Sequence, residues 1–434
     1  YQALTNLEPG LVLENHSFRF WDDSKASSYV DFASQATRKR ELARKTRMDL
    51  AALLGERAMT NKLVSVFTLP RTSKKSVKTE LKAQKAKADE FLELIQPVID
   101  RLPDATLMNV DEFGEVVQRG NNPGDARKGL FRKFDHRFHL NEQWCSEKPA
   151  FDSGLLRQGD TYCWIGLLDM YPDIAQPGWS EFLLSDCSAE FQITQIIRRA
   201  NTRKVVAKAE SDQSKEQDAL NEKGRTFLRA KVRDLEQFGQ YIADNRIEVL
   251  DNTYVIRVQH TNKEYVTKLR DLVRDSLASE GARVQDSERI QRHFWRISQP
   301  AQGYLSKFQR PDAADLVLNM APIICHDSGQ GRPLLMRLTQ EHQLAYFDLP
   351  ENAANHNCCS GKTRSGKGAE KVLRMLETYP MGIDQYMIEY GGSYRWVIRA
   401  LGGQYITIDP DTMYLNPLPS YEDVALAKAN NKIS

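Results

Sequence analysis

The sequence predicts an α/β protein with a mixed α/β N-terminal region and a C-terminal region built around a parallel sheet. Two observations lead to this prediction. Residues 254–280 have the pattern of a strand followed by an amphipathic helix, and after residue 331 short apolar segments alternate with helical ones around a glycine-rich loop. We therefore divide the 434 residues into three segments of ordinary domain size, 1–150, 151–335 and 336–434.

The composition is that of an ordinary soluble protein, with 41% hydrophobic and 27% charged residues. The net charge of +2 arises from 60 basic and 58 acidic residues, so the overall balance gives no bulk attraction to nucleic acid. No apolar run approaches the ~18 residues that cross a bilayer, and no signal peptide is visible. The chain begins at Tyr1 rather than Met, and we expect it to be a piece of a longer protein.

The six cysteines show no C-x-x-C spacing, which argues against a zinc site, and a disulfide framework is not expected in a chain of this length. We expect reduced thiols in a cytoplasmic protein, at Cys145, Cys163, Cys187, Cys325, Cys358 and Cys359.

The first segment predicts one extended stretch and two basic helices. Leu11–Phe20 is extended, Ala36–Leu54 is helical and ends at Gly55, and a second helix covers about Lys74–Arg101. The first helix has apolar positions offset from its basic ones, at Leu42, Met48, Leu50, Leu53 and Leu54. The basic faces fit docking on an anionic membrane or an acidic partner, but a solvated helix face is the favoured interpretation.

The second segment predicts a separate α/β unit. Tyr162–Leu168 fits a buried strand, and Glu190–Gln237 is predicted to be mostly helical, with a strongly charged stretch that protrudes. Tyr254–Gln259 alternates like a strand, and helix Asn262–Glu280 follows. The helix has one apolar face, formed by Leu269, Leu272, Val273 and Leu277. This strand–helix–strand spacing predicts a small ferredoxin-like layer.

The most informative feature is a glycine-rich loop that runs from Gly361 to Gly368. It fits G-x-x-x-x-G-K-[ST], in which backbone N–H groups surround a phosphate and the lysine reaches the β/γ oxygens, except that Gly368 replaces the hydroxyl residue. We predict nucleotide binding here, with Lys367 as the catalytic cation. The alternative is a glycine-rich surface turn. The predicted nucleotide-binding residues are Gly361, Lys362, Thr363, Arg364, Ser365, Gly366, Lys367, Gly368 and Ala369.

The elements around the loop predict a β–loop–α–β–α–β order. The strands are expected at Asn357–Ser360, Tyr386–Ile388 and Gln404–Ile408. The first helix, Gly368–Tyr379, is predicted to face a core with Ala369, Val372, Leu373 and Leu376. The second helix, Tyr394–Leu401, has Ser393 as its predicted N-cap and Gly402-Gly403 at its end. Its predicted buried face is Tyr394, Val397, Ile398 and Leu401.

Gly368 has no hydroxyl for Mg²⁺, so we expect nucleotide binding to depend little on that ion. Glu389 ends a predicted strand and is a candidate metal or water-activating acid; the favoured alternative is a loop acid that orders the Gly391-Gly392 turn. We identify no metal ligand. Three isolated histidines are expected to be ordinary surface or core residues: His326, His342 and His356.

Four motifs in order resemble the large ATPases of type IV secretion and conjugative transfer systems. They are Asn357–Gly368, Ile388–Tyr394, Leu401–Ile406 and Leu415–Pro417. The stretch from Trp164 to Gly178 is more weakly similar to the family's N-terminal domain.

The resemblance implies a RecA-like motor that assembles as a hexamer, cytoplasmic and peripheral on the bacterial inner membrane. Its partners would be inner-membrane secretion-complex proteins and other secretion ATPases. ATP hydrolysis, with Mg²⁺ in the full protein, would drive pilus assembly or substrate transfer.

Three departures from the family keep alternatives open. Glu389 stands where the family usually has Asp, and Arg364 with Gly368 gives a loop more typical of coupling-protein ATPases. The chain ends before any Walker B strand, so we expect this piece alone to be inactive in hydrolysis. The alternatives are a coupling-protein-like DNA translocase, with direct nucleic acid contact left open, and a structural scaffold with a degenerate nucleotide site.

Overall fold

The computed structural model describes most of the chain as two compact units. The described residues are 11–33, 41–68, 77–101, 105–145, 148–152, 154–183, 189–223, 233, 236–242, 244, 247–322, 329, 331–339, 342–348, 358–362 and 364–408. The first, which we call the sheet unit, comprises the described residues of Tyr1–Ala26, Leu53–Gln330 and Met336–Tyr346. The second, the phosphate-loop unit, comprises those of Ser27–Ala52, Gly331–Leu335 and Phe347–Ser434.

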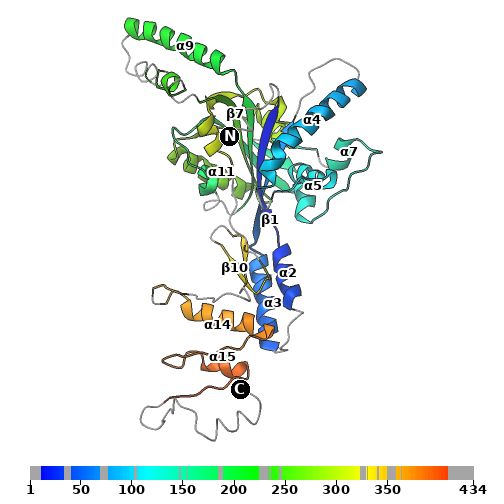
Figure 1. The fold of residues 1–434 in the computed structure, drawn as a ribbon, viewed down its shortest axis with the longest axis vertical. Coiled ribbons are helices and arrows are strands. Elements are labelled where there is room, and N and C mark those ends of the chain that lie inside the picture. Colours follow the sequence, from blue (N-terminus) through cyan, green and yellow to red (C-terminus); the bar gives the residue numbers. More distant parts are fainter. Residues whose placement is uncertain are drawn as a thin grey trace. The chain divides into compact units, whose positions relative to one another are not determined.

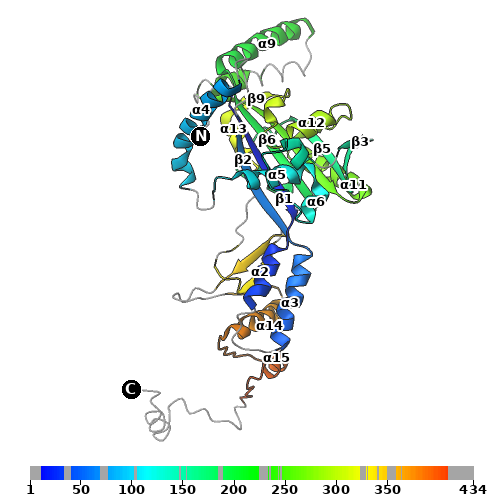
Figure 2. The same ribbon diagram turned by 90° about the vertical axis from the view of Figure 1, so that its right-hand side faces the viewer.

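A large antiparallel sheet organises the sheet unit (Figures 1 and 2). Its strands are β1 (Val12–Trp21), β2 (Met59–Thr68), β3 (Ala150–Asp152), β4 (Leu155–Gln158), β5 (Thr161–Met170), β6 (Glu190–Arg199), β7 (Val249–His260), β8 (Arg283–Gln285) and β9 (Arg310–Ala313). The order is β2-β1-β6-β7-β5-β4-β3, with β8 also paired to β5 and β9 to β7. Strands from before and after residue 150 thus share one sheet, while the three-segment division stays a prediction.

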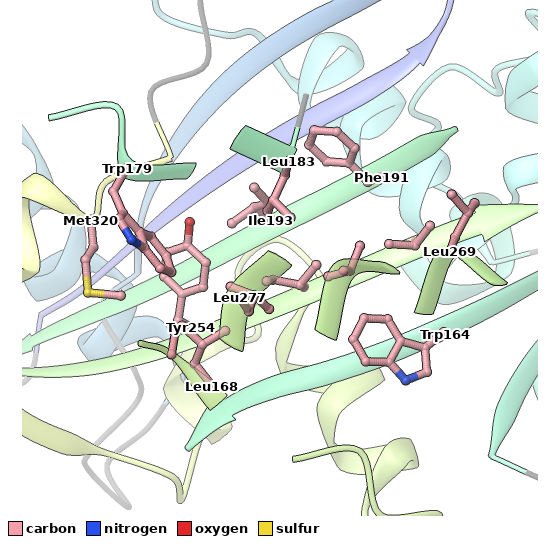
Figure 3. Close-up of a cluster of buried hydrophobic side chains, with 14 of the residues drawn as sticks. Trp164, Leu168, Trp179, Leu183, Phe191, Ile193, Tyr254, Leu269, Leu277 and Met320 are labelled. Atoms are coloured by element: carbon pink, nitrogen blue, oxygen red, sulfur yellow. The ribbon is translucent and has the colours of Figure 1, made fainter. Parts of the chain in front are cut away.

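The central strands are buried on both faces, and apolar side chains from them form a core on each side of the sheet. On one face Trp164 of β5 and Tyr254 of β7 pack with Leu269 and Leu277 of α11 (Lys263–Ser279), as Figure 3 shows. On the opposite face a second core includes residues of β5, β7 and α12 (Gln291–Ile297): Ile165, Leu167, Val255, Phe294 and Ile297. The predicted α11 face is right at three positions but wrong at Leu272, which is 39% exposed.

Further helices of the sheet unit lie in the connections between its strands, and several of them pack against the sheet. They are α4 (Val77–Ile99), α5 (Val110–Asn121), α6 (Pro123–Arg127), α7 (Leu140–Trp144), α9 (Thr202–Lys223) and α13 (Ala314–Asn319), with 3-10 turns at Trp179–Glu181 and Gly303–Leu305. A capping box starts α5, since the Asn109 side chain and Glu112 exchange hydrogen bonds with each other's backbone N–H groups. Val116 of α5 then packs on β1 and β2 through Phe18 and Val64.

One helix prediction fails at its first ten residues. Glu190–Gln237 is predicted to be mostly helical, but Glu190–Arg199 is strand β6, paired with β1 and β7. Its sequence is rich in isoleucine, and a strand between two neighbours buries Phe191 on one face and Ile196 on the other. Helix α9 follows from Thr202, as expected of the charged stretch.

Two helices begin or end at the boundary between the two units. They are α2 (Ser24–Ala33) and α3 (Glu41–Gly55), which lie in sequence between β1 and β2. The α3 prediction is confirmed over its described residues, but its buried face differs from the expected one. Ala43, Arg47 and Ala51 are buried, whereas large apolar side chains at Leu42 and Met48 are exposed.

The rest of the phosphate-loop unit contains α14 (Lys367–Thr378), a 3-10 turn at Tyr379–Met381 and α15 (Arg395–Ala400). A two-stranded sheet, β10 (Leu335–Leu338) with β11 (Leu344–Phe347), crosses the boundary between the units. The small core joins Ala43 of α3 to α14 and α15 through Met375, Leu376, Val397 and Leu401. This core confirms the predicted inner face of the second helix, with Tyr394 and Ile398 partly buried against it.

Three predicted strands of the C-terminal region are wrong within the described residues. Residues 358–360, Tyr386–Ile388 and Gln404–Ile408 form no strand. Between 382 and 390 exposure alternates from residue to residue, so the chain has the side-chain pattern of a strand without a neighbour to pair with. The molecule is a mixed α/β protein whose large sheet is antiparallel, and the parallel-sheet motor fold stays a prediction.

Membrane-spanning helices are not found in the part of the chain that the structure describes. None of its helices is both long enough and apolar enough to cross a bilayer.

Candidate functional site

The glycine-rich loop leads directly into the first turn of α14. Gly366 has φ 89° and is the N-cap of the helix, a left-handed conformation that glycine adopts without steric cost. Arg364, with φ 67°, is one of three non-glycine residues with positive φ in the described part of the chain. A Cβ on Gly361 would lie 2.7 Å from the Ser365 Oγ, so the loop is tight at that point as well. Thr363 lies outside the described residues.

The Lys367 side chain folds back over its own loop. Its Nζ donates hydrogen bonds to the backbone carbonyls of Gly361 and Lys362, the latter at 2.8 Å. The Ser365 N–H also donates to the Lys362 carbonyl, at 3.2 Å. The ammonium group is therefore held inside the loop, the position from which it can neutralise a phosphate.

The first turn of α14 can receive an anion. In the described part of the chain, no side chain caps this helix end, so the first N–H groups have no side-chain acceptor. The helix macrodipole adds positive potential at the same place. A phosphate-binding site uses these same three features: a glycine-rich loop, a lysine and the N-terminus of a helix.

Buried Arg47 of α3 holds the opposite end of α14. Its guanidinium donates to the carbonyls of Glu377 (2.9 Å) and Leu334 (3.0 Å), and further to those of Pro333 and Tyr29. A cation at a helix C-terminus complements the dipole and satisfies carbonyls that the helix leaves free. Burial lowers the pKa of Arg47, while the neighbouring Tyr29 and Glu377 raise it.

Two further contacts fix Arg47 in this position. The Tyr29 ring lies 3.8 Å from the guanidinium carbon, a cation–π contact. The Tyr29 hydroxyl donates to the Glu377 carboxylate at 2.6 Å, and both Arg47 and Glu377 are fully buried. In the sequence, Arg47 is one of several basic residues on this helix. The signal for its burial is its i+4 spacing from Ala43 and Ala51, which form the small-residue face of α3.

Tyr394 is a second residue that sequence reasoning did not connect to the loop. A Cβ built on Gly368 would lie 3.7 Å from the Tyr394 hydroxyl. This hydroxyl therefore lies near the position whose side-chain hydroxyl the loop lacks. The distance is an ordinary contact, so a small side chain at 368 would fit.

The Glu389 carboxylate is engaged by the turn that follows it. Its two oxygens accept hydrogen bonds from the backbone N–H groups of Ser393 and Tyr394, both at 3.0 Å. This geometry is the one expected if Glu389 orders the turn at Gly391-Gly392 and does not act on a metal ion or a water molecule. Ser393 is not the N-cap of α15; that position belongs to Tyr394, and the carboxylate of Glu389 supplies the acceptor.

The other predicted positions are distributed as follows. Ala369 is exposed rather than core-facing, whereas Val372 and Leu376 pack in the core. Within the described residues, no cluster of three or more His, Cys, Asp or Glu side chains could hold a metal ion. His326 and His356 lie outside the described residues, and so do Cys187 and Cys325.

No protein-family model matches this chain, and no curated protein matches it.

Proposed function

We propose that this chain is an ATP-binding motor subunit of a type IV secretion or conjugation system, which drives pilus assembly or substrate transfer at the inner membrane. The observation that carries the proposal is the glycine-rich loop at the N-terminus of α14, with Lys367 folded over it. The motif order from Gly361 to Ile406 supports a RecA-like motor around that loop. A hexamer, Mg²⁺ and contacts with membrane-complex proteins and other secretion ATPases belong to the same proposal.

The sheet unit supports the N-terminal part of this proposal. The described elements follow in the order β5, the 3-10 turn Trp179–Glu181, β6, α9, β7, α11 and β8, and the strands lie in the order β6-β7-β5-β8, with every pairing antiparallel. The spatial order of the four strands and the position of α11 between β7 and β8 are those of a ferredoxin-like layer, which favours that prediction for the middle of the chain, with α9 inserted between two of its strands.

Titration with a fluorescent ATP analogue tests nucleotide binding. Lys367→Ala removes a charge-assisted contact to phosphate and should weaken affinity by about 10- to 100-fold. Lys371→Ala, four residues further along α14 and exposed, should bind like the wild type. Because Gly368 supplies no hydroxyl, Mg²⁺ should tighten binding by less than about 30-fold, equivalent to about 2 kcal/mol. Equal affinity of both lysine variants would remove the basis of the proposal.

A second candidate function is a scaffold with a degenerate nucleotide site. The full hydrogen-bonding of Glu389 by the α15 turn favours it, because that acid is then occupied structurally. Complementation separates the two functions. Full-length protein carrying Lys367→Ala should fail to support secretion or conjugation if the chain is a motor, whereas wild-type transfer by that variant would establish the scaffold.

A further inference from the structure

The connection between α6 and α7 carries exposed apolar and basic side chains together. Residues 128–140, which we call the basic–apolar loop, contain four lysines or arginines and a single acid, Asp135. Large apolar side chains project into solvent from the same loop, at Leu130 (60% exposed), Phe134 (42%), Phe138 (57%) and Leu140 (51%). The basic side chains, all exposed, are Lys128, Arg132, Lys133 and Arg137. Figure 1 shows this region in cyan, beside α5 and α7.

Two buried glutamines hold the backbone of this loop in place. Gln118 of α5 accepts the Arg132 N–H at 2.8 Å and donates to the Arg132 carbonyl at 2.9 Å. Gln143 of α7 accepts the Asp135 N–H and donates to the carbonyls of Asp135 and Phe138. The two glutamine side chains therefore hydrogen-bond backbone N–H and carbonyl groups of the loop and fix its conformation. The exposed side chains extend from this ordered backbone, and Phe134 in addition packs on the Trp144 ring of α7, with the ring centroids 6.2 Å apart.

The acids near the loop are already engaged. Asp135 forms a two-point ion pair with Arg137, and Asp111 of α5 accepts the Phe134 N–H at 2.7 Å. Arg132 and Lys133 form no ion pair with any residue that the structure describes within the 4 Å limit for such pairs. A partner of this surface is therefore expected to be anionic and also able to cover leucine and phenylalanine.

We propose that the basic–apolar loop docks on the surface of an anionic lipid bilayer. Phospholipid headgroups attract lysine and arginine, and the acyl boundary below them accepts apolar side chains. Single-stranded nucleic acid is the other anionic partner that contacts exposed aromatics, but it binds them by base stacking. Leu130 and Leu140 have no ring on which a base could stack. A lipid surface can contact these leucines as well as the phenylalanines, so it explains more of the exposed side chains.

This surface is distinct from the two basic helices singled out in the sequence. Helix α3 presents Arg44 and Lys45, and α4 is rich in lysine, but both were favoured as solvated faces. The basic–apolar loop lies in the sheet unit and does not include the phosphate loop. Lipid docking can therefore fail without affecting nucleotide binding, and the reverse also holds.

Vesicle co-sedimentation of the full chain, without nucleotide, tests the proposal. The probes are phosphatidylcholine vesicles and vesicles in which phosphatidylglycerol replaces part of the phosphatidylcholine. The wild type should sediment with the anionic vesicles only. Arg132→Gln/Lys133→Gln should lower the partition coefficient by about 25-fold, since each charge near the surface contributes about fivefold. Leu130→Ser/Phe138→Ser should lower it as well, and should make the remaining binding disappear at high salt.

Two matched pairs control for general charge effects. Arg203→Gln/Lys204→Gln on α9 and Arg44→Gln/Lys45→Gln on α3 remove the same two charges from other exposed helix faces, and both should bind like the wild type. Thermal unfolding of every variant checks that it is folded. The proposal is overturned if the wild type does not bind anionic vesicles, if either loop variant binds like the wild type, or if the α3 pair is the one that loses binding. Loop-dependent binding of a single-stranded oligonucleotide without vesicle binding would overturn it too.

Discussion

Arg47 illustrates how one buried side chain positions the candidate site. Four backbone carbonyls share its guanidinium, and one of them belongs to the last turn of α14, the helix that begins at the phosphate loop. Burial lowers the pKa of this cation, and the attraction of the buried Glu377 carboxylate raises that pKa by less. The carbonyl dipoles, the Tyr29 ring and the negative end of the helix add to the stabilisation.

Arg47→Met should weaken the phosphate-loop unit by about 3 kcal/mol, because it leaves buried carbonyls without donors. Arg47→Lys should cost less, since the ammonium keeps the charge but reaches fewer acceptors. Hydrogen exchange of the α14 amides measures the free energy of local opening directly. Arg44→Met is the control, because Arg44 lies on the exposed side of the same helix. Unchanged protection of α14 in Arg47→Met would refute the anchoring role.

The elements divide into those that sequence pattern could predict and those that it could not. β1, β5, β7, α11 and α14 were predictable because each carries its own periodicity or glycine signal. The β6 prediction fails because its polar residues Gln192 and Thr194 are buried, where both donate hydrogen bonds to the carbonyl of Ser298 at the end of α12. No periodicity within β6 indicates those partners.

The candidate site shows the same division between local and distant information. The Gly366 conformation and the Lys367 contacts follow from residues within one short motif. Arg47 and Tyr29 come from more than 300 residues earlier in the chain, and no local pattern connects them to α14. The strand predictions after residue 380 fail for a related reason, since a strand requires a neighbour and the described residues supply none there.

Within strand β5, Gly166 leaves room for the side chains of Val284 and Trp164. A Cβ at this position would lie 2.3 Å from the Val284 Cγ1 and 2.7 Å from the Trp164 ring, whose indole N–H is tied to Asp286 at 3.0 Å. Gly166→Ala should therefore destabilise the sheet unit by about 1–3 kcal/mol.

Urea unfolding followed by tryptophan fluorescence measures this change. Adding Val284→Ala to Gly166→Ala removes one of the two clashes and should recover part of the loss. Gly239→Ala is the control, because a Cβ there has no atom within 4 Å. A Gly166→Ala protein as stable as the wild type would show that β5 can shift to accommodate the methyl group.

At the scale of the whole molecule, the phosphate-loop unit is assembled from three separate stretches of chain. Residues of α3, the Gly331–Leu335 segment and α14 meet at Arg47, and Ala43 completes the core around Met375 and Leu376. The helix that follows the glycine-rich loop thus packs on a helix encoded between the first two strands of the sheet.

A fragment of residues 331–434 should consequently fail to form a stable α14. Without Ala43 and Arg47 the apolar face of the helix is uncovered, and a 12-residue helix is marginal on its own in water. Circular dichroism of the fragment should show little helix compared with the same residues in the full chain, whose protection can be read by hydrogen exchange. A fragment that melts cooperatively and binds the ATP analogue with wild-type affinity would contradict this dependence.

The arrangement around Arg47 also has a consequence for protein synthesis. Arg47 and its acceptor at Glu377 are 330 residues apart, so at ~5–20 residues per second the ribosome adds the partner about 15 to 65 seconds after the arginine. During that interval α3 lacks the C-terminal turn of α14, whose carbonyl accepts a hydrogen bond from Arg47 in the folded protein. The phosphate loop itself is translated shortly before Glu377. The proposed nucleotide binding should therefore appear late and abruptly in a growing chain, after all nine strands of the large sheet have been synthesised.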